Sequence, residues 1–189
     1  MLFQLTPAAM PDGYGEGLLP LEDAKAHLRV DWSDEDGLIA LLRDAAIEAV
    51  EKYTSLYLAP RTGLIATLAG FGPGMRLGRG PDASVSVTAI SYVGSDGASV
   101  DLDEGEWRVV VGGELRPAIG ACWPTSYGDV TVTFDAGFPE GTCPKGLLMG
   151  ARLMLGHLYM NREAVIGGTV IEMPLGACWW CDQHRMPVI

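Results

Sequence analysis

Residues 33–56 have the sequence SDEDGLIALLRDAAIEAVEKYTSL, which contains the clearest helical pattern in the chain. From Leu38 to Tyr53 apolar side chains recur at spacings of three and four, as they do along one face of an α-helix. Ser33 and Asp36 have the spacing of a capping box, in which the two side chains accept hydrogen bonds from free N–H groups at the helix start. The pattern therefore predicts a capped amphipathic helix over residues 34–56.

A second long helix is predicted over residues 144–162. Pro144 suits the first position of a helix, and the residues after it are leucine, methionine and alanine with almost no polar face. A helix that is apolar nearly all round must be covered on more than one side. We expect a neighbouring subunit to provide the second cover. A shorter helix is predicted over residues 21–30, where Leu21, Ala24 and Leu28 share a face.

Between the helices, residues 62–138 have the features of β-structure. Asp129–Phe134 alternates between apolar and polar residues, as a half-buried strand does. Asp96-Gly97 and Gly112-Gly113 are typical turns of β-hairpins. The sequence thus predicts an α+β fold: an α-helical bundle with an inserted small antiparallel β-region, formed as a sheet or a barrel-like meander.

The two ends of the chain differ from this central domain of residues 20–163. Residues 1–19 contain prolines and glycines without periodicity, which predicts a flexible, extended arm. Residues 164–189 are rich in apolar and aromatic side chains and have few charges. Such a tail either folds back on the core or docks on a partner, and we predict docking through Met173, Leu175, Trp179 and Trp180.

The chain is acidic, with a formal net charge of −11 over 189 residues. A surface of this sign repels phosphate, so ordinary nucleic-acid binding is disfavoured. The charge serves solubility, or it serves a protein that DNA must pass without sticking. No apolar run is long enough to span a membrane, and the N-terminus has no secretory signal, so no membrane partner is expected.

A search for catalytic motifs gives no constellation above background. There is no phosphate-binding loop, nucleophile elbow or metalloprotease motif, and the acidic stretch Asp101–Glu106 lacks the features of a calcium loop. Cys178, Cys181 and His184 have the spacing of part of a zinc or redox site, although no second ligand pair is present. We therefore predict no enzyme activity, no catalytic residue, no metal and no cofactor, and keep a small zinc or redox protein as the less favoured alternative.

The order of several short segments resembles the head–tail connector (adaptor) proteins of long-tailed phages and gene transfer agents. The resemblance covers about residues 20–163 and rests on Leu21–Val30, Asp34–Ile39, Ala49–Thr54, Leu77–Pro81, Ile90–Val93 with Asp96-Gly97, Trp123-Pro124, Val130–Phe138, Cys143–Leu147 and Tyr159–Glu163. The tail after Glu163 has no counterpart in it.

This resemblance implies a structural virion component at the head–tail junction, assembled in the host cytoplasm. It implies a homo-oligomeric ring, with about twelve copies, that sits under the portal protein. It also implies contacts with stopper and tail proteins and a channel that DNA crosses without sequence-specific binding. A stopper or tail-terminator ring component is the alternative within such particles, but those proteins are more purely β. For the contacts between subunits we select apolar residues of the two long helices: Leu38, Leu42, Tyr53, Leu147, Met154 and Leu158.

Overall fold

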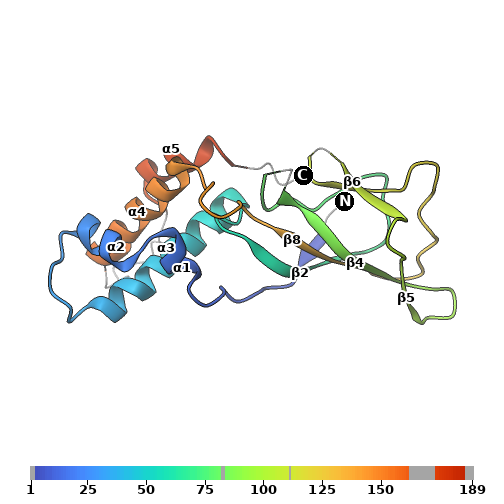
Figure 1. The fold of residues 1–189 in the computed structure, drawn as a ribbon, viewed down its shortest axis with the longest axis horizontal. Coiled ribbons are helices and arrows are strands. Elements are labelled where there is room, and N and C mark those ends of the chain that lie inside the picture. The colour runs from blue at the N-terminus through green and yellow to red at the C-terminus, as the bar shows by residue number, and fades with distance from the viewer. Residues whose placement is uncertain (1–2, 82–83, 111, 162–172, 186–189) are drawn as a thin grey trace, which may run out of the picture. The chain divides into compact units, whose positions relative to one another are not determined.

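The protein folds into two compact units in a computed structural model that describes residues 3–81, 84–110, 112–161 and 173–185. Of the described residues, 10–59, 141–161 and 173–185 form a helical unit, and the described parts of 3–9 and 60–140 form a β unit. Figure 1 shows the β-region inserted between the helices in chain order. The predicted α+β class with an inserted antiparallel β-region is confirmed.

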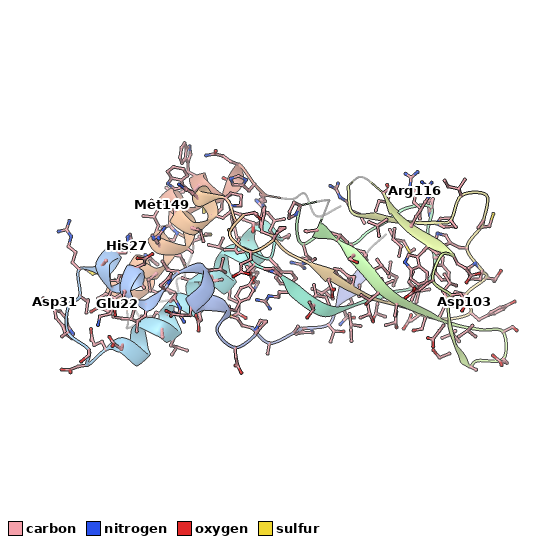
Figure 2. The ribbon with its side chains drawn as sticks, in the orientation of Figure 1. Glu22, His27, Asp31, Asp103, Arg116 and Met149 are labelled. Atoms are coloured by element: carbon pink, nitrogen blue, oxygen red, sulfur yellow. The ribbon has the colours of Figure 1, made fainter. Side chains whose placement is uncertain are left out.

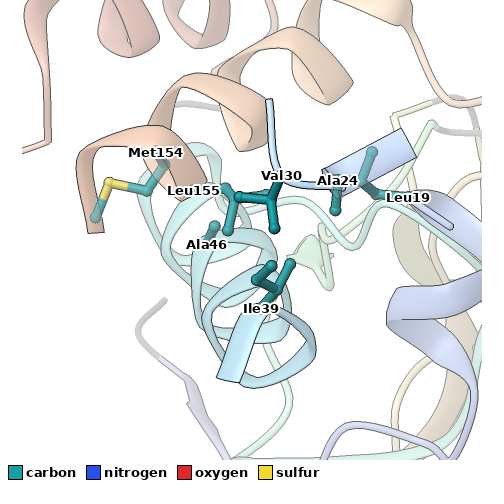
Figure 3. Packing of buried hydrophobic residues seen from close by; sticks show 7 residues of the cluster. All are labelled: Leu19, Ala24, Val30, Ile39, Ala46, Met154 and Leu155. Atoms are coloured by element: carbon teal, nitrogen blue, oxygen red, sulfur yellow. The ribbon is translucent and has the colours of Figure 1, made fainter. Parts of the chain in front are cut away.

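The helical unit is built on two long helices, α3 (Asp36–Thr54) and α4 (Lys145–Met160), which pack on one another. Three short helices surround them: α1 (Tyr14–Leu18), α2 (Leu21–Leu28) and α5 (Leu175–Asp182). A buried apolar cluster joins α2, α3 and α4 (Figure 3) and contains Leu19, Ala24, Val30, Ile39, Ala46, Met154 and Leu155. Burial of this apolar area holds the helices together.

The three predicted helices are present, each with ends within two residues of the prediction, but the predicted capping box is wrong. Helix α3 begins after Glu35, and no side chain caps it. The Asp36 carboxylate instead forms an ion pair with the Lys25 ammonium of α2, with Nζ and Oδ1 2.7 Å apart. Lys25 is buried, and a buried ammonium requires a partner, so the carboxylate is used between helices rather than at the helix start. The hydrogen bond with Asp36 raises the pKa of Lys25.

The β unit contains two antiparallel sheets. The five-stranded sheet has the order β1 (Phe3–Leu5), β2 (Arg61–Leu68), β8 (Val130–Ala136), β4 (Ser86–Val93), β5 (Ser99–Asp101). The three-stranded sheet has the order β3 (Met75–Arg76), β7 (Glu114–Pro117), β6 (Trp107–Val110). Strand β8 buries alternate residues, as predicted from its alternating pattern.

Both predicted hairpins form, but the strands are not in the order of a meander. Asp96-Gly97 joins β4 to β5, and Gly112-Gly113 joins β6 to β7. Both glycines of the second turn have positive φ, 95° and 62°, which explains why glycine stands there. Strand β8 returns from the end of the region to pair with both β2 and β4, so the central strand comes last in the chain.

The two ends of the chain are more structured than predicted. The N-terminal segment is not an extended arm, because β1 pairs with β2 and α1 follows it with Tyr14 buried. In the tail, α5 packs on α4 and provides its second cover within the same subunit, so a neighbouring subunit is not needed for that purpose. Residues 162–172 and 186–189 of the predicted tail lie outside the described residues.

Candidate interaction surfaces

The C-terminal helix α5 is held against α4 by close packing over two glycines. A Cβ atom on Gly150 would lie 2.6 Å from the Cys181 sulfur, and one on Gly146 would meet the Trp180 ring at 3.4 Å. Ala177 and Cys181 point into this contact and are fully buried. The small residues of α4 therefore allow α5 to dock closely, which resolves the tail in favour of folding back on the core.

The opposite side of α5 is an exposed apolar surface. Leu175 is 88% exposed and Trp179 is 61% exposed. Trp180 lies edge-on to Trp179, with ring centroids 4.8 Å apart, and is half-buried. Met173 packs against the apolar cluster. Of the four predicted docking residues, Leu175 and Trp179 are thus fully available to a partner, and we call them the α5 surface.

Helix α5 is also tied to the end of α3. The Tyr53 hydroxyl donates a hydrogen bond of 2.7 Å to Asp182, and the Arg185 guanidinium lies 4.8 Å from the centre of the Tyr53 ring. The hydrogen bond with Asp182, followed by one with Cys178, raises the pKa of Tyr53. Tyr53, predicted to contact another subunit, therefore makes specific contacts within its own.

The structure does not bring Cys178, Cys181 and His184 together as a set of metal ligands. Among the residues that the structure describes, no three His, Cys, Asp or Glu side chains converge as metal ligands would. Burial raises the pKa of Cys181 to about 11. The Cys178 thiol donates to the Met173 carbonyl oxygen at 3.5 Å. Because the thiolate is the form that attacks or binds metal, these contacts favour structural thiols.

A second exposed apolar surface lies along α3. Leu38, Leu41 and Ala45 recur at helical spacing on a face that the described residues leave exposed, and Leu41 is 66% exposed. Glu48 and Lys52 continue this line toward the end of the helix. We call Leu38, Leu41, Ala45 and Glu48 the α3 face. The residues selected from the sequence included Leu38 but not Leu41. The apolar stripe of this helix is wide, and the sequence does not show which side of the stripe faces the core.

The α3 face borders a pocket of about 290 Å³ between α3 and the segment that leads into α1. Its lining consists of Met10, Pro11, Asp12, Gly13, Tyr14, Gly15, Leu41, Arg43, Asp44, Ala45 and Glu48. Three of these residues, Asp12, Asp44 and Glu48, are acidic. The lining therefore combines apolar side chains such as Leu41 and Met10 with three carboxylates and the Arg43 guanidinium.

The wall of this pocket is fixed by buried polar contacts. The Tyr14 hydroxyl donates to the Glu51 carboxylate and accepts from the Ala59 N–H at 2.9 Å, while Glu51 also accepts from the Leu58 N–H at 2.9 Å. Arg43, nearly buried, pairs with Glu16 of α1 and with Asp44 at 2.9 Å. These contacts fasten α1 to α3.

Two of the residues predicted to join subunits are interior residues. Leu147 is fully buried and Met154 is 6% exposed, because both pack inside the helical unit. Their selection is corrected: the apolar excess of α4 is satisfied by α2, α3 and α5 of the same chain. Leu42 and Leu158 are half-buried against the same cluster. Leu38 stays accessible on the α3 face.

The structure thus defines a class: an α+β protein whose described residues present two apolar surfaces and no cluster of metal-ligating side chains. Within the described part of the chain, no helix has both the length and the apolar character needed to cross a membrane. Such features are typical of a protein that works by binding other proteins.

Comparison with known proteins shows what this chain is similar to. Residues 19–91 match the family described as phage gp6-like head–tail connector protein. The fold matches a chain of the neck of an empty gene transfer agent (GTA) particle computed with C6 symmetry, with a TM-score of 0.72, 25% identity and coverage of 100% of this chain and 97% of that one. A chain of the virion of a native GTA particle matches equally well, with a TM-score of 0.72, 25% identity and coverage of 98% and 96%.

A third match, at 24% identity and a TM-score of 0.68, is a chain of the neck of a native GTA particle computed with C12 symmetry, with coverage of 100% and 97%. No curated protein matches the chain. The resemblance to head–tail connector proteins found in the sequence is confirmed: residues 19–91 match the connector family, and the fold matches a GTA neck chain over the whole length.

Proposed function

We propose that this protein is a structural connector subunit that forms a ring in the neck of a phage-like or GTA particle and joins the head to the tail. The observation that carries the proposal is the match of the whole chain to a neck protein of a GTA particle, together with the connector family match.

The ring follows from the symmetry of the particles whose chains this protein resembles. One of these necks was computed with C6 symmetry, and a cyclic neck is built from repeated identical subunits. We propose a ring of about twelve copies, because portal rings of this copy number would present one site for each connector subunit. The ring sits under the portal protein and continues toward stopper and tail proteins.

The α5 surface is the candidate contact with the portal. Leu175 and Trp179 are the most exposed apolar side chains of this helix, and they stand on a base that α4 and Tyr53 hold in place. Large apolar and tryptophan side chains on a rigid helix are the residues that dominate binding energy at protein interfaces. Met173 and Trp180 support this surface from half-buried positions rather than forming its outer layer.

The negative charge suits a ring through which DNA passes. With a formal net charge of −11 per subunit, a ring of many copies repels the phosphate backbone rather than binding it. We therefore propose that DNA crosses the ring without sequence-specific contacts.

The portal contact is tested by cosedimentation of the purified protein with portal rings from the same particle. A Leu175→Ala, Trp179→Ala double variant should lose binding by at least tenfold and keep the circular dichroism spectrum of the wild type. Tyr127→Ala is the matched control, since Tyr127 is 67% exposed and lies in the β unit. Wild-type binding by the double variant would reject the α5 surface as the portal contact.

A further inference from the structure

Two opposite faces of the helical unit are suited to bind each other in a ring. The first is the α3 face with its pocket. The second lies on α4. The buried side of this helix is defined by Leu147, Ala151, Met154 and Leu155. Met149 is about half a turn from Leu147 and therefore points away from α3. Figure 2 marks Met149 on the side of α4 away from α3. Arg152 and Met160 share this outward side, and Met160 is 79% exposed.

Charge argues against pairing of two α3 faces. Asp12, Asp44 and Glu48 line the pocket of the α3 face together with Arg43, which pairs with Asp44. Two copies of this face in contact would bring the Asp12 and Glu48 carboxylates of both copies together. Helix α4 contains no acidic residue, and its charged side chains are Lys145, Arg152 and His157. Arg152 makes a loose ion pair of 3.6 Å with Asp23 and is partly exposed, so its guanidinium can also reach a carboxylate outside the subunit.

Ring geometry requires two different surfaces on each subunit. A cyclic ring closes through head-to-tail contacts, in which one patch of a subunit binds another patch of the next, whereas a two-fold contact joins a patch to itself and stops at a dimer. The α3 face and the outward side of α4 belong to the same compact unit. The α3 face carries the exposed side chains of Leu38 and Leu41, and the outward side of α4 carries half-buried Met149 and exposed Met160. They therefore meet the requirement without any change of fold.

From these observations we infer that the α3 face of one subunit receives the outward side of α4 of a second copy of this chain. Met149 and Met160 supply apolar contacts for Leu41, and Arg152 faces the Glu48 carboxylate. This inference rests on the proposed ring function and specifies which surfaces build the ring. The portal contact on α5 is left free by this arrangement.

The test uses cysteine cross-linking, which traps weak contacts between subunits. In a Cys122→Ser background, which removes the exposed native thiol, Leu41→Cys and Met149→Cys are introduced singly and together. A short bismaleimide is then added to the full-length protein, free in solution and bound to portal rings. The background protein without new cysteines is the control for reaction at the remaining native thiols.

The double variant should give a ladder of covalent oligomers, and each single variant alone should give none. An equal mixture of the two single variants should give covalent dimers and nothing larger, because position 41 joins only to position 149. Dimers from one single variant alone, or no ladder from the double variant in either sample, would overturn the assignment. If the ladder fails while wild-type protein still binds portal rings, the surfaces are wrong and the connector function stands; if portal binding also fails, the function itself is rejected.

Discussion

The most informative single substitution is Tyr14→Phe, because it removes one hydroxyl from the buried contacts that fasten the pocket wall to α3. That hydroxyl donates to the Glu51 carboxylate and accepts from the Ala59 N–H at 2.9 Å. Tyr14 is 8% exposed and Glu51 is 4% exposed, so water reaches the carboxylate poorly after the change. The aromatic ring is kept, so no cavity of ring size is formed.

The expected loss follows from the type of hydrogen bond removed. A hydrogen bond to a charged group contributes about 1.5–3 kcal/mol, and the half-exposed Ala59 amide can turn to water, so we expect a loss of about 2 kcal/mol. At about 2–4 °C per kcal/mol for a protein of this size, the melting temperature should fall by about 4–8 °C. Where exchange is limited by local opening, the same energy speeds exchange of the Ala59 amide about 30-fold.

Hydrogen exchange measured by NMR reads this effect at the site itself. The amides of Leu58 and Ala59 should lose protection in Tyr14→Phe, whereas amides of β8 should not change. Tyr127→Phe is the matched control, because its exposed hydroxyl should contribute less than about 0.5 kcal/mol. Protection of Ala59 within twofold of the wild type would show that the Tyr14 hydroxyl does not hold the wall.

Three further outcomes are expected from the packing. Gly150→Leu places a side chain where the Cys181 sulfur lies, at a cost of about 1–3 kcal/mol. This should release α5 from α4, so that maleimide labels Cys181 faster than in the wild type. Gly156→Ala is the control, because a Cβ atom there has its nearest neighbour at 3.5 Å and should leave the labelling rate unchanged. In the wild type at pH 8, maleimide should label exposed Cys122 at least tenfold faster than Cys181, because burial raises the pKa of Cys181 to about 11. Equal labelling rates would contradict the burial of Cys181. Trp123→Phe removes an indole N–H that donates to a backbone carbonyl at 3.1 Å, so urea unfolding of the β unit should show a loss of about 1 kcal/mol; an unchanged midpoint would refute it.

The parts of the fold that depend on local pattern could be predicted from the sequence. Helix α3 and strand β8 repeat their apolar residues at the periods of helix and strand over many residues, so both were found with nearly correct ends. The hairpin turns were found because glycines with positive φ are required there. The resemblance to connector proteins added the function, which no residue pattern could give alone.

The parts that depend on tertiary contacts could not be predicted. Elements β1 and α1 have three and five residues, too short to show a period, and exist because β2 and α3 stabilise them. Asp36 has the right spacing for a cap, but buried Lys25 recruits it instead. Leu41 and Leu147 are equally apolar in sequence, yet Leu41 is exposed on the α3 face and Leu147 is fully buried on the inner side of α4, a difference that depends on tertiary packing.

The central claim, that this protein builds a connector ring in the neck, is tested most directly by electron microscopy of the purified protein mixed with portal rings of the same particle. The account predicts an additional ring stacked on the portal, with one connector subunit for each portal subunit. Portal rings that stay bare at saturating protein, or that carry scattered single subunits without a closed ring, would contradict it.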